Sequence, residues 1–479
     1  MASLVLVPFL LVIILNLVNT AAIRRAAVAV GIGWSLVQLA WLLFPQTRLS
    51  GLDSGIFGID FSSFFASDGL SLVMLISVGL VGLVTLITGL ATVPDEKARF
   101  SFVNLVLLTM AGLNGLVMVR DLFSLYVYIE VVAVASFILI SLDRDKLALE
   151  GAFKYLVLSA SASMLMLLSI SAILLICGST SFDTVHSVLG QVPQKGLVAS
   201  AMVLFVVAAF IKGGLVPFHG WLPDAYSSAP LSVSVLLSGI ITKTAGVYTV
   251  MRIVTSVFGF TPMIQSLLLF IGTVSIIFGA LAALNQKDFR RMLAYSSISQ
   301  MGYIIVALGC GTVYGMAGAL FHLFNHAVSK SQLFVNAAAV EQETGSRDMT
   351  KLGGLASRMP VTSGTSVVAL LSIAGIPPLA GFWSKLVIII ALWQSGHHNY
   401  ALIAVVASTI TLGYFLLLQR RMFFGKTPSE LSGIKEARAG LLVPALILSA
   451  IAIALGIAFP AAINWFVRLP AGIMNMVVH

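Results

Sequence analysis

Long apolar runs follow one another along almost the whole chain, and they constrain the fold more than any other feature. Between residues 2 and 469 the sequence divides into mainly apolar stretches of roughly 20 residues, the length that crosses a hydrocarbon core of about 30 Å. Charged residues make up only 9% of the 479 residues, against about 25% in soluble domains. We therefore predict an all-α integral membrane protein of about 14 transmembrane helices.

Short polar loops separate the predicted spans. The spans cover residues 2–19, 27–44, 69–92, 101–119, 122–141, 151–177, 197–217, 229–253, 262–285, 293–311, 315–340, 360–395, 401–418 and 440–469. The first span lacks a basic start, and Arg24 and Arg25 follow it instead. We interpret it as a retained helix and not as a signal peptide.

Basic residues are distributed unequally between the two sides of the membrane. If the N-terminus is outside, 18 of the 27 lysines and arginines fall on the inner side and 5 on the outer side. The positive-inside rule then predicts a multi-pass protein of the cell inner membrane or plasma membrane with both termini outside. This distribution accounts for the formal charge of +9 without a nucleic-acid partner.

Four lysines remain, and all of them lie inside the apolar runs: Lys212, Lys243, Lys330 and Lys385. Glu130 is the acid that sits well within a span. A charge at mid-bilayer costs about 2.5–3.5 kcal/mol, so such residues normally face a hydrated interior and have a function there. The alternative for any single lysine is that it reaches the headgroups from a helix end. This alternative would have to hold for four lysines on four different helices at once, so the pattern favours a functional row of buried lysines.

Lysine is suited to proton transfer because burial lowers its pKa and a nearby carboxylate can switch it between charged and neutral forms. Glu130 is the carboxylate available for this switch, and we expect Lys212 to face it. An arginine would not serve, since it does not release its proton.

His322, His326 and Lys330 are spaced four residues apart, which places them on one face of a helix. A stripe of groups that bind and release protons can conduct protons along the helix. The alternatives are a structural pair of hydrogen-bonded histidines and a bis-histidine haem site, although two axial ligands usually come from facing helices. Lys330 favours conduction.

Prolines interrupt two long spans in corresponding places, at Pro217 and at Pro377 and Pro378. Breaks at membrane depth free backbone groups that protein or water must satisfy, so they mark a lined cavity. Each break lies in the fourth helix of a five-helix block, which predicts two inverted five-helix repeats, each with a discontinuous helix. The predicted segments are residues 1–100 (three helices), 101–255 (first repeat), 256–425 (second repeat) and 426–479 (C-terminal helix).

Several segments resemble one family, the antiporter-like membrane subunits of respiratory complex I, membrane-bound hydrogenases, formate hydrogenlyases and Mrp-type sodium/proton antiporters. The resemblance covers roughly residues 65–425. It is carried by Glu130 with the SFILI that follows it, FIKGGLVPFHGWLPDAYSSAP (210–230), ITKTAGVY (241–248), QKDFRRMLAYSSISQMGY (286–303), FHLFNHAVSKSQLF (321–334) and GIPPLAGFWSK (375–385).

The resemblance implies a role for each buried group. Glu130 and Lys212 resemble the family's ion pair, and Lys243 resembles its connecting lysine. His322, His326 and Lys330 look like its relay, and Lys385 is similar to the terminal lysine nearest the outer exit. Two positions depart from the family pattern without removing a charge: Ile129 replaces a tryptophan, and Thr244 replaces a methionine.

We expect a subunit that moves protons or Na⁺ along this Glu/Lys/His relay within a redox-driven complex, such as an NADH or ferredoxin:quinone oxidoreductase or a membrane-bound hydrogenase. Its partners would be other membrane subunits and, through them, a peripheral redox arm. The alternatives are a subunit of an Mrp-type Na⁺/H⁺ antiporter with no redox partner, and a membrane scaffold. Cys177 and Cys310 have no metal-ligand spacing, so we expect no cofactor in this chain.

Overall fold

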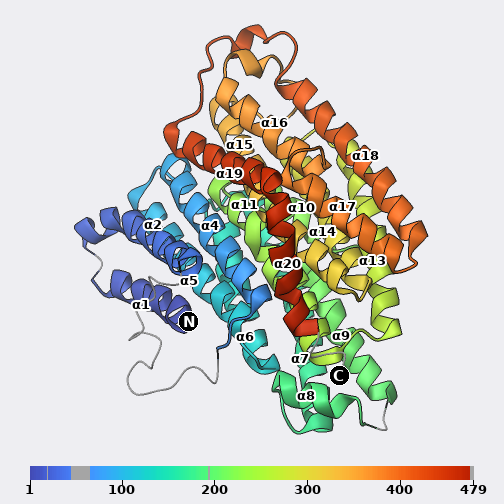
Figure 1. The fold of residues 1–479 in the computed structure, drawn as a ribbon. Coiled ribbons are helices and arrows are strands. Elements are labelled where there is room, and N and C mark those ends of the chain that lie inside the picture. Colours follow the sequence, from blue (N-terminus) through green and yellow to red (C-terminus); the bar gives the residue numbers. More distant parts are fainter. Residues whose placement is uncertain (19, 45–64, 193–194, 475–479) are drawn as a thin grey trace.

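The computed structural model describes residues 1–18, 20–44, 65–192 and 195–474. Within these ranges the regular structure is helical apart from three isolated β-bridges, which confirms the all-α prediction for this part of the chain. The helices pack side by side, with the N-terminal helices on one flank of the molecule and α13, α17 and α18 on the opposite flank (Figure 1).

The first half of the chain contains α1 (Ser3–Leu17), α2 (Ala21–Leu43), α4 (Gly69–Thr92), α5 (Glu96–Met118), α6 (Leu122–Ile140), α7 (Lys146–Cys177), α8 (Phe182–Leu189), α9 (Lys195–Gly213) and α10 (Trp221–Ser228). A continuous helix follows, with π-helical turns: α11 (Leu231–Leu236), η2 (Leu237–Ile241), η3 (Lys243–Tyr248), α12 (Thr249–Ile253) and η4 (Val254–Phe258).

The second half contains α13 (Pro262–Leu284), α14 (Phe289–Gly309), α15 (Val313–Thr344), η5 (Leu355–Ser357), α16 (Pro360–Ala374), α17 (Ala380–Gln394), α18 (His398–Met422), η6 (Ser429–Leu431), α19 (Ala439–Ile457) and α20 (Phe459–Met474).

Eleven of the described helices are long and apolar enough to cross a membrane. The three other predicted spans fall on α1, on α15 and on the pair α16–α17. The chain is therefore a helical multi-pass membrane protein. The total of about fourteen spans stays a prediction, because α1, α16 and α17 are each shorter than a full span.

Aspartate side chains begin five of these helices. Each accepts a hydrogen bond from a backbone N–H of the first helical turn, at Asp68, Asp95, Asp121, Asp145 and Asp288. Such caps satisfy backbone donors that have no partner within the helix. They also place these acids at the ends of the helices and not along their apolar faces.

The most buried helices form the centre of the molecule. The span Leu231–Phe258 is buried along almost its whole length, and α15 is surrounded by α4, α11, α14, α16, α17, α19 and α20. By contrast, α7 and α19 leave more than half of their residues accessible on the outside of the bundle. The buried polar groups are therefore concentrated where the protein itself, and not lipid, surrounds them.

The predicted last span, residues 440–469, is two helices in the structure. α19 ends at Ile457, and α20 begins at Phe459 and runs along the front of α15 and α4 (Figure 1). Pro460 lies in the first turn of α20, where a helix tolerates the missing N–H of proline. The sequence is apolar on both sides of the boundary between α19 and α20, so it did not predict where α19 ends.

Candidate functional site

The Glu130 and Lys212 side chains meet between α6 and α9. Lys212 Nζ lies 3.0 Å from Glu130 Oε1, and the lysine side chain is 2% exposed while the glutamate side chain is 32% exposed. The predicted facing of these two residues is what the structure shows. A buried ammonium needs such a partner, since removing its charge from water is costly.

Two serines of α7 complete the surroundings of the pair. Lys212 Nζ donates to Ser159 Oγ at 2.7 Å and to Ser163 Oγ at 3.0 Å. Ser163 Oγ donates in turn to Glu130 Oε1. The three hydrogen-bonding positions of the ammonium are thus occupied by one carboxylate and two hydroxyls.

Lys243 follows in the adjacent helix, at the start of the π-helical segment η3. Its side chain is fully buried, and Nζ donates to the carbonyl of Ser238 one turn earlier. Gly213, which follows Lys212, packs backbone to backbone on Gly246, because a Cβ at Gly246 would lie 2.2 Å from Gly213 Cα. This contact holds the helix of Lys243 directly against the end of α9.

The α15 stripe continues the row in the centre of the bundle. His322, His326 and Lys330 are each at most 1% exposed, and the two imidazole rings lie 6.3 Å apart and nearly parallel. His326 is within electrostatic range of Lys243, Lys330 and Lys385. The stripe therefore connects the first group of buried charges with the last.

Lys330 is held by α14. Its Nζ donates to the carbonyl of Leu293 at 2.8 Å and to Ser296 Oγ, and it lies 5.7 Å from the ring centroid of Phe415. None of these partners is a carboxylate. The environment of Lys330 thus differs from that of Lys212, whose charge is compensated by Glu130.

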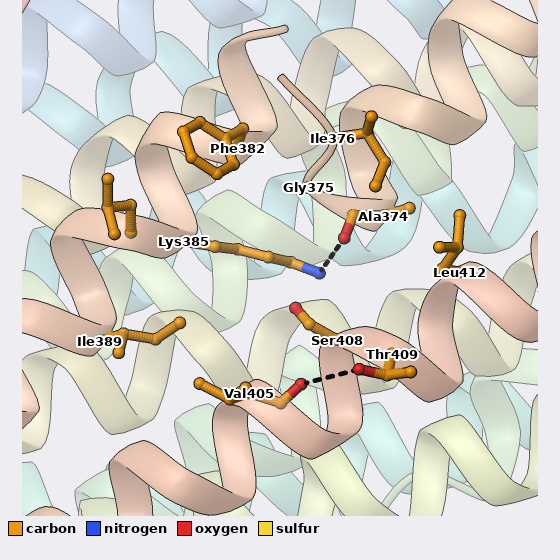
Figure 2. A pocket seen from close by; sticks show the side chains of 11 residues that line it. Ala374, Gly375, Ile376, Phe382, Lys385, Ile389, Val405, Ser408, Thr409 and Leu412 are labelled. Atoms are coloured by element: carbon orange, nitrogen blue, oxygen red, sulfur yellow. Dashed lines mark hydrogen bonds between the residues drawn. The ribbon is translucent and has the colours of Figure 1, made fainter. Parts of the chain in front are cut away.

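Lys385 ends the row on α17, just beyond the second helix break. Its Nζ lies 3.5 Å from the carbonyl oxygen of Ala374 and 4.7 Å from the ring centroid of Tyr303. Figure 2 shows the lysine reaching across a cavity of about 240 Å³, with Ser408 and Thr409 of α18 beside it. The neighbouring Ser384 Oγ lies 2.9 Å from His322 Nδ1 and so joins α17 to the stripe.

Several buried polar atoms along the row have no hydrogen-bond partner among the described protein atoms. They include both ring nitrogens of His326, Nε2 of His322, the Asn325 amide nitrogen and both side-chain atoms of Gln300. An unpaired buried polar group costs about 1–3 kcal/mol, and buried water commonly satisfies such groups. This cluster favours a hydrated interior around α15.

The two predicted breaks have the same backbone geometry. α9 ends at Gly213 and α16 at Ala374, and the next residue in each case, Gly214 or Gly375, has a left-handed φ of 64° or 87°. A residue with a side chain rarely adopts such a φ. Pro217 and the pair Pro377–Pro378 then lie between the helix halves.

Sequence reasoning missed two buried arginines. Arg252 is 1% exposed and donates to Asp68 at 2.6 and 2.8 Å, which ties η3–α12 to the start of α4. Arg290 is 2% exposed and contacts Glu341 and the carbonyls of Tyr226 and Ala229. Both lie near span ends, so the sequence suggested solvent contact. Among the described residues, no three His, Cys, Asp or Glu side chains gather as a metal site.

Comparison with known proteins gives one consistent result. Residues 119–411 match the family described as "NADH:quinone oxidoreductase/Mrp antiporter, TM". The chain is 32% identical over 437 residues to the D-type subunit of the Na(+)/H(+) antiporter of Alkalihalophilus pseudofirmus, covering 91% of this chain and 88% of that protein. It is 33% identical over 378 residues to the N-type subunit of the NADH-quinone oxidoreductase of Desulforudis audaxviator, covering 76% and 75%.

The fold agrees with these relatives. A chain in the structure of the Mrp complex from Dietzia sp. superposes with a TM-score of 0.89 at 25% identity, covering 100% of this chain and 99% of that one. The matched region contains every residue of the buried row described above, from Glu130 to Lys385. This protein is therefore a member of the NADH:quinone oxidoreductase/Mrp antiporter family of transmembrane subunits.

Proposed function

We propose that this antiporter-like subunit translocates protons, or Na⁺ in exchange for protons, along the row Glu130, Lys212, Lys243, His326, Lys330, His322 and Lys385. The observation that carries the proposal is the Glu130–Lys212 ion pair, with 3.0 Å between Nζ and Oε1, at one end of a row of buried amines and imidazoles. When the pair is disturbed, Lys212 can pass its proton to the next group.

We propose further that the chain works beside other membrane subunits. Glu130 interrupts a stripe of exposed apolar residues on α6, formed by Phe123, Val127, Val134 and Ile138. Lipid cannot satisfy a carboxylate at membrane depth, whereas a polar group of a neighbouring subunit can. This supports a partner on the α6 face.

The relatives belong to two kinds of assembly. In the first, a redox-driven complex, electron transfer on other chains drives this subunit through a peripheral arm, which the relative named as part of a quinone oxidoreductase supports. In the second, an Mrp-type antiporter, an ion gradient drives it, which the long match to the D-type antiporter subunit supports. We place the protein in the cell inner or plasma membrane, with both termini outside and no cofactor of its own.

The translocation proposal is tested with Lys212→Ala and Glu130→Ala in the assembled complex. Each variant should abolish proton movement into inside-out vesicles, measured with a pH-sensitive dye, while the complex still assembles. Lys195→Ala and Glu430→Ala change exposed residues and serve as matched controls. Normal transport by Lys212→Ala or Glu130→Ala would refute the proposal.

The subunits that co-purify distinguish the two assemblies. Chains that carry iron–sulfur clusters would support the redox-driven complex. Small membrane subunits alone, together with Na⁺-dependent proton movement, would support the antiporter.

A further inference from the structure

Two of the longest helices, α7 and α15, correspond to each other residue by residue. Each has 32 residues and ends at a left-handed glycine, Gly178 with φ 67° or Gly345 with φ 66°. Isolated bridges pair Asp121 with Ser181 in the first half and Asp288 with Asp348 in the second. Both members of the second bridge lie 167 residues after those of the first, so this part of the fold is repeated without insertion or deletion.

The same shift of 167 residues aligns the functional stripe of α15 with a hydroxyl stripe of α7. Tyr155 corresponds to His322, Ser159 to His326 and Ser163 to Lys330. The neighbouring residues of the two helices support this register, since four pairs are identical: Gly151 and Gly318, Ala152 and Ala319, Leu156 and Leu323, and Ala160 and Ala327.

The helix breaks correspond in the same way, with a shift of 161 residues. The amide of Leu215 donates to the carbonyl of Phe210 at 3.1 Å, and that of Ile376 donates to the carbonyl of Leu371 at 3.0 Å. This register places Asp224 of α10 at the position of Lys385 of α17.

Asp224 and Lys385 also occupy similar surroundings. Lys385 lines the cavity of Figure 2, and Asp224 lines a cavity of about 390 Å³. The second cavity, which we call the α10 cavity, is lined by polar residues that include Glu150, Lys154, Asp224, Asp288, Arg291 and Arg347. The charge distribution of the sequence assigns these residues to the inner side of the membrane.

The α7 stripe leads from the α10 cavity to the ion pair. Gly151 lines the cavity, and Tyr155 lies one turn further along the same helix face. The buried Tyr155 side chain lies one turn before Ser159 on the same face of α7, and Ser159 Oγ accepts from Lys212 Nζ at 2.7 Å. From Gly151 to Ser159 the helix rises about 12 Å. A row of hydroxyls thus bridges the depth between the cavity and the lysine.

We infer that Tyr155, Ser159 and Ser163 form an inner proton path from the α10 cavity to Glu130 and Lys212, as the first-half counterpart of the α15 relay; this rests on the proposed translocation function. Lys212 Nζ donates to both serine hydroxyls and so links them. Lys212 passes a proton to Ser163 Oγ, which releases its own proton, and the neutral amine then takes a proton from Ser159 Oγ, which is reprotonated from the cavity through the Tyr155 hydroxyl. The final acceptor is the Glu130 carboxylate, to which Ser163 Oγ already donates. Each hydroxyl is regenerated, and one proton has moved.

The surroundings of Asp224 fit a residue at the inner entrance of the proposed proton path. Its carboxylate accepts from Lys154 Nζ at 2.7 Å on α7 and from Arg291 at 2.8 Å on α14. These ion pairs leave α10 attached to both helices while the cavity beside them stays open. Asp224 therefore stands where a proton from the inner side would first meet the protein.

The path is tested by removing single hydroxyls in the assembled complex. Tyr155→Phe keeps the ring that packs 5.0 Å from Trp221 but removes the hydroxyl, and it should lower the rate of proton movement about tenfold or more. Ser159→Ala should act in the same direction. Ser161→Ala, an exposed serine on the opposite face of α7, and Tyr314→Phe, an exposed tyrosine, should leave the rate unchanged.

Two further outcomes separate this inference from the function on which it rests. Wild-type rates in Tyr155→Phe, Ser159→Ala and Ser163→Ala, together with a lost rate in Lys212→Ala, would overturn the inner path and leave the translocation proposal standing. A normal rate in Lys212→Ala would overturn both.

Blocking the cavity gives an independent measurement. Ser228 lines the α10 cavity, and Ser228→Cys is made in a background in which Cys177 and Cys310 are replaced by alanine. A membrane-impermeant methanethiosulfonate added to the inner side should label this cysteine and inhibit transport. Complete labelling from that side without inhibition, or labelling from the outer side alone, would overturn the inference.

Discussion

Asp68 shows how this chain compensates a buried charge outside the relay row. Its carboxylate lies at the start of α4 and contacts Arg252 and, at 3.2 Å, Arg120. Burial by itself raises the pKa of Asp68, but the charges of Arg252 and Arg120 and the Ser71 N–H outweigh it and hold the pKa well below its usual range. The stabilisation is therefore fully present above the unfolded pKa of about 3.9 and is lost as the pH falls below it.

Asp68→Asn should lower the free energy of unfolding at pH 7 by about 3 kcal/mol, because Arg252 is left buried without its counter-charge. The difference from the wild type should shrink below about pH 4, because the Asp68 carboxylate of the unfolded wild type then takes up a proton while that of the folded protein is still charged. Thermal unfolding of the purified protein in detergent measures both effects. Asp183→Asn, at an exposed position of α8, is the control, and equal unfolding temperatures for both variants at pH 7 would contradict the prediction.

Lys212→Arg separates charge from proton exchange at the ion pair. Arginine keeps the positive charge beside Glu130 but does not release its proton, so assembly should persist while proton movement is lost. The dye assay in inside-out vesicles measures the rate, and Lys195→Arg at the exposed start of α9 is the control. Substantial transport by Lys212→Arg would show that Lys212 acts only as a fixed charge.

At the scale of helices, α9 and η3 approach each other backbone to backbone. Gly213 and Gly246 touch through their backbones, and no side chain separates Lys212 from the helix that carries Lys243. Small residues permit such close approach of membrane helices. The spacing of the two lysines therefore depends on two positions that carry no charge.

Gly246→Ala should push α9 and η3 apart, since the new Cβ would lie 2.2 Å from Gly213 Cα. We expect a lower unfolding temperature and a reduced transport rate from the same variant. Gly364→Ala in α16 is the matched control, because a Cβ there meets no atom within 4 Å. A wild-type rate and stability for Gly246→Ala would show that the contact has no such role.

Much of this arrangement could be predicted because the responsible residues are unusual in a membrane helix. Glu130, the four lysines and the prolines each break an apolar run, and each marks a group or a break that the structure places along one row. The hydroxyls of Tyr155, Ser159 and Ser163 carry no such signal, since serine is common in transmembrane helices and costs little there. In the sequence, only the register between residues 146–177 and 313–344 distinguishes them from Ser161, whereas the structure also separates them by burial and by the contacts of the two serines with Lys212.

At the scale of the whole molecule, the orientation rests on the unequal distribution of basic residues. Single cysteines test it in the background that lacks Cys177 and Cys310. Ser432→Cys, between α18 and α19, should react with an impermeant maleimide from the inner side, and Gln191→Cys, between α8 and α9, from the outer side. Both positions are exposed. The reverse pattern would place the α10 cavity on the outer side.

The burial of α15 also bears on how the chain enters the bilayer. This helix is long enough to span it but falls short of the hydropathy of the eleven apolar helices. A lysine at a helix centre alone opposes insertion by about 2.5–3.5 kcal/mol. We therefore expect α15 to enter the membrane together with α14 and α16, which pack against it in the folded protein.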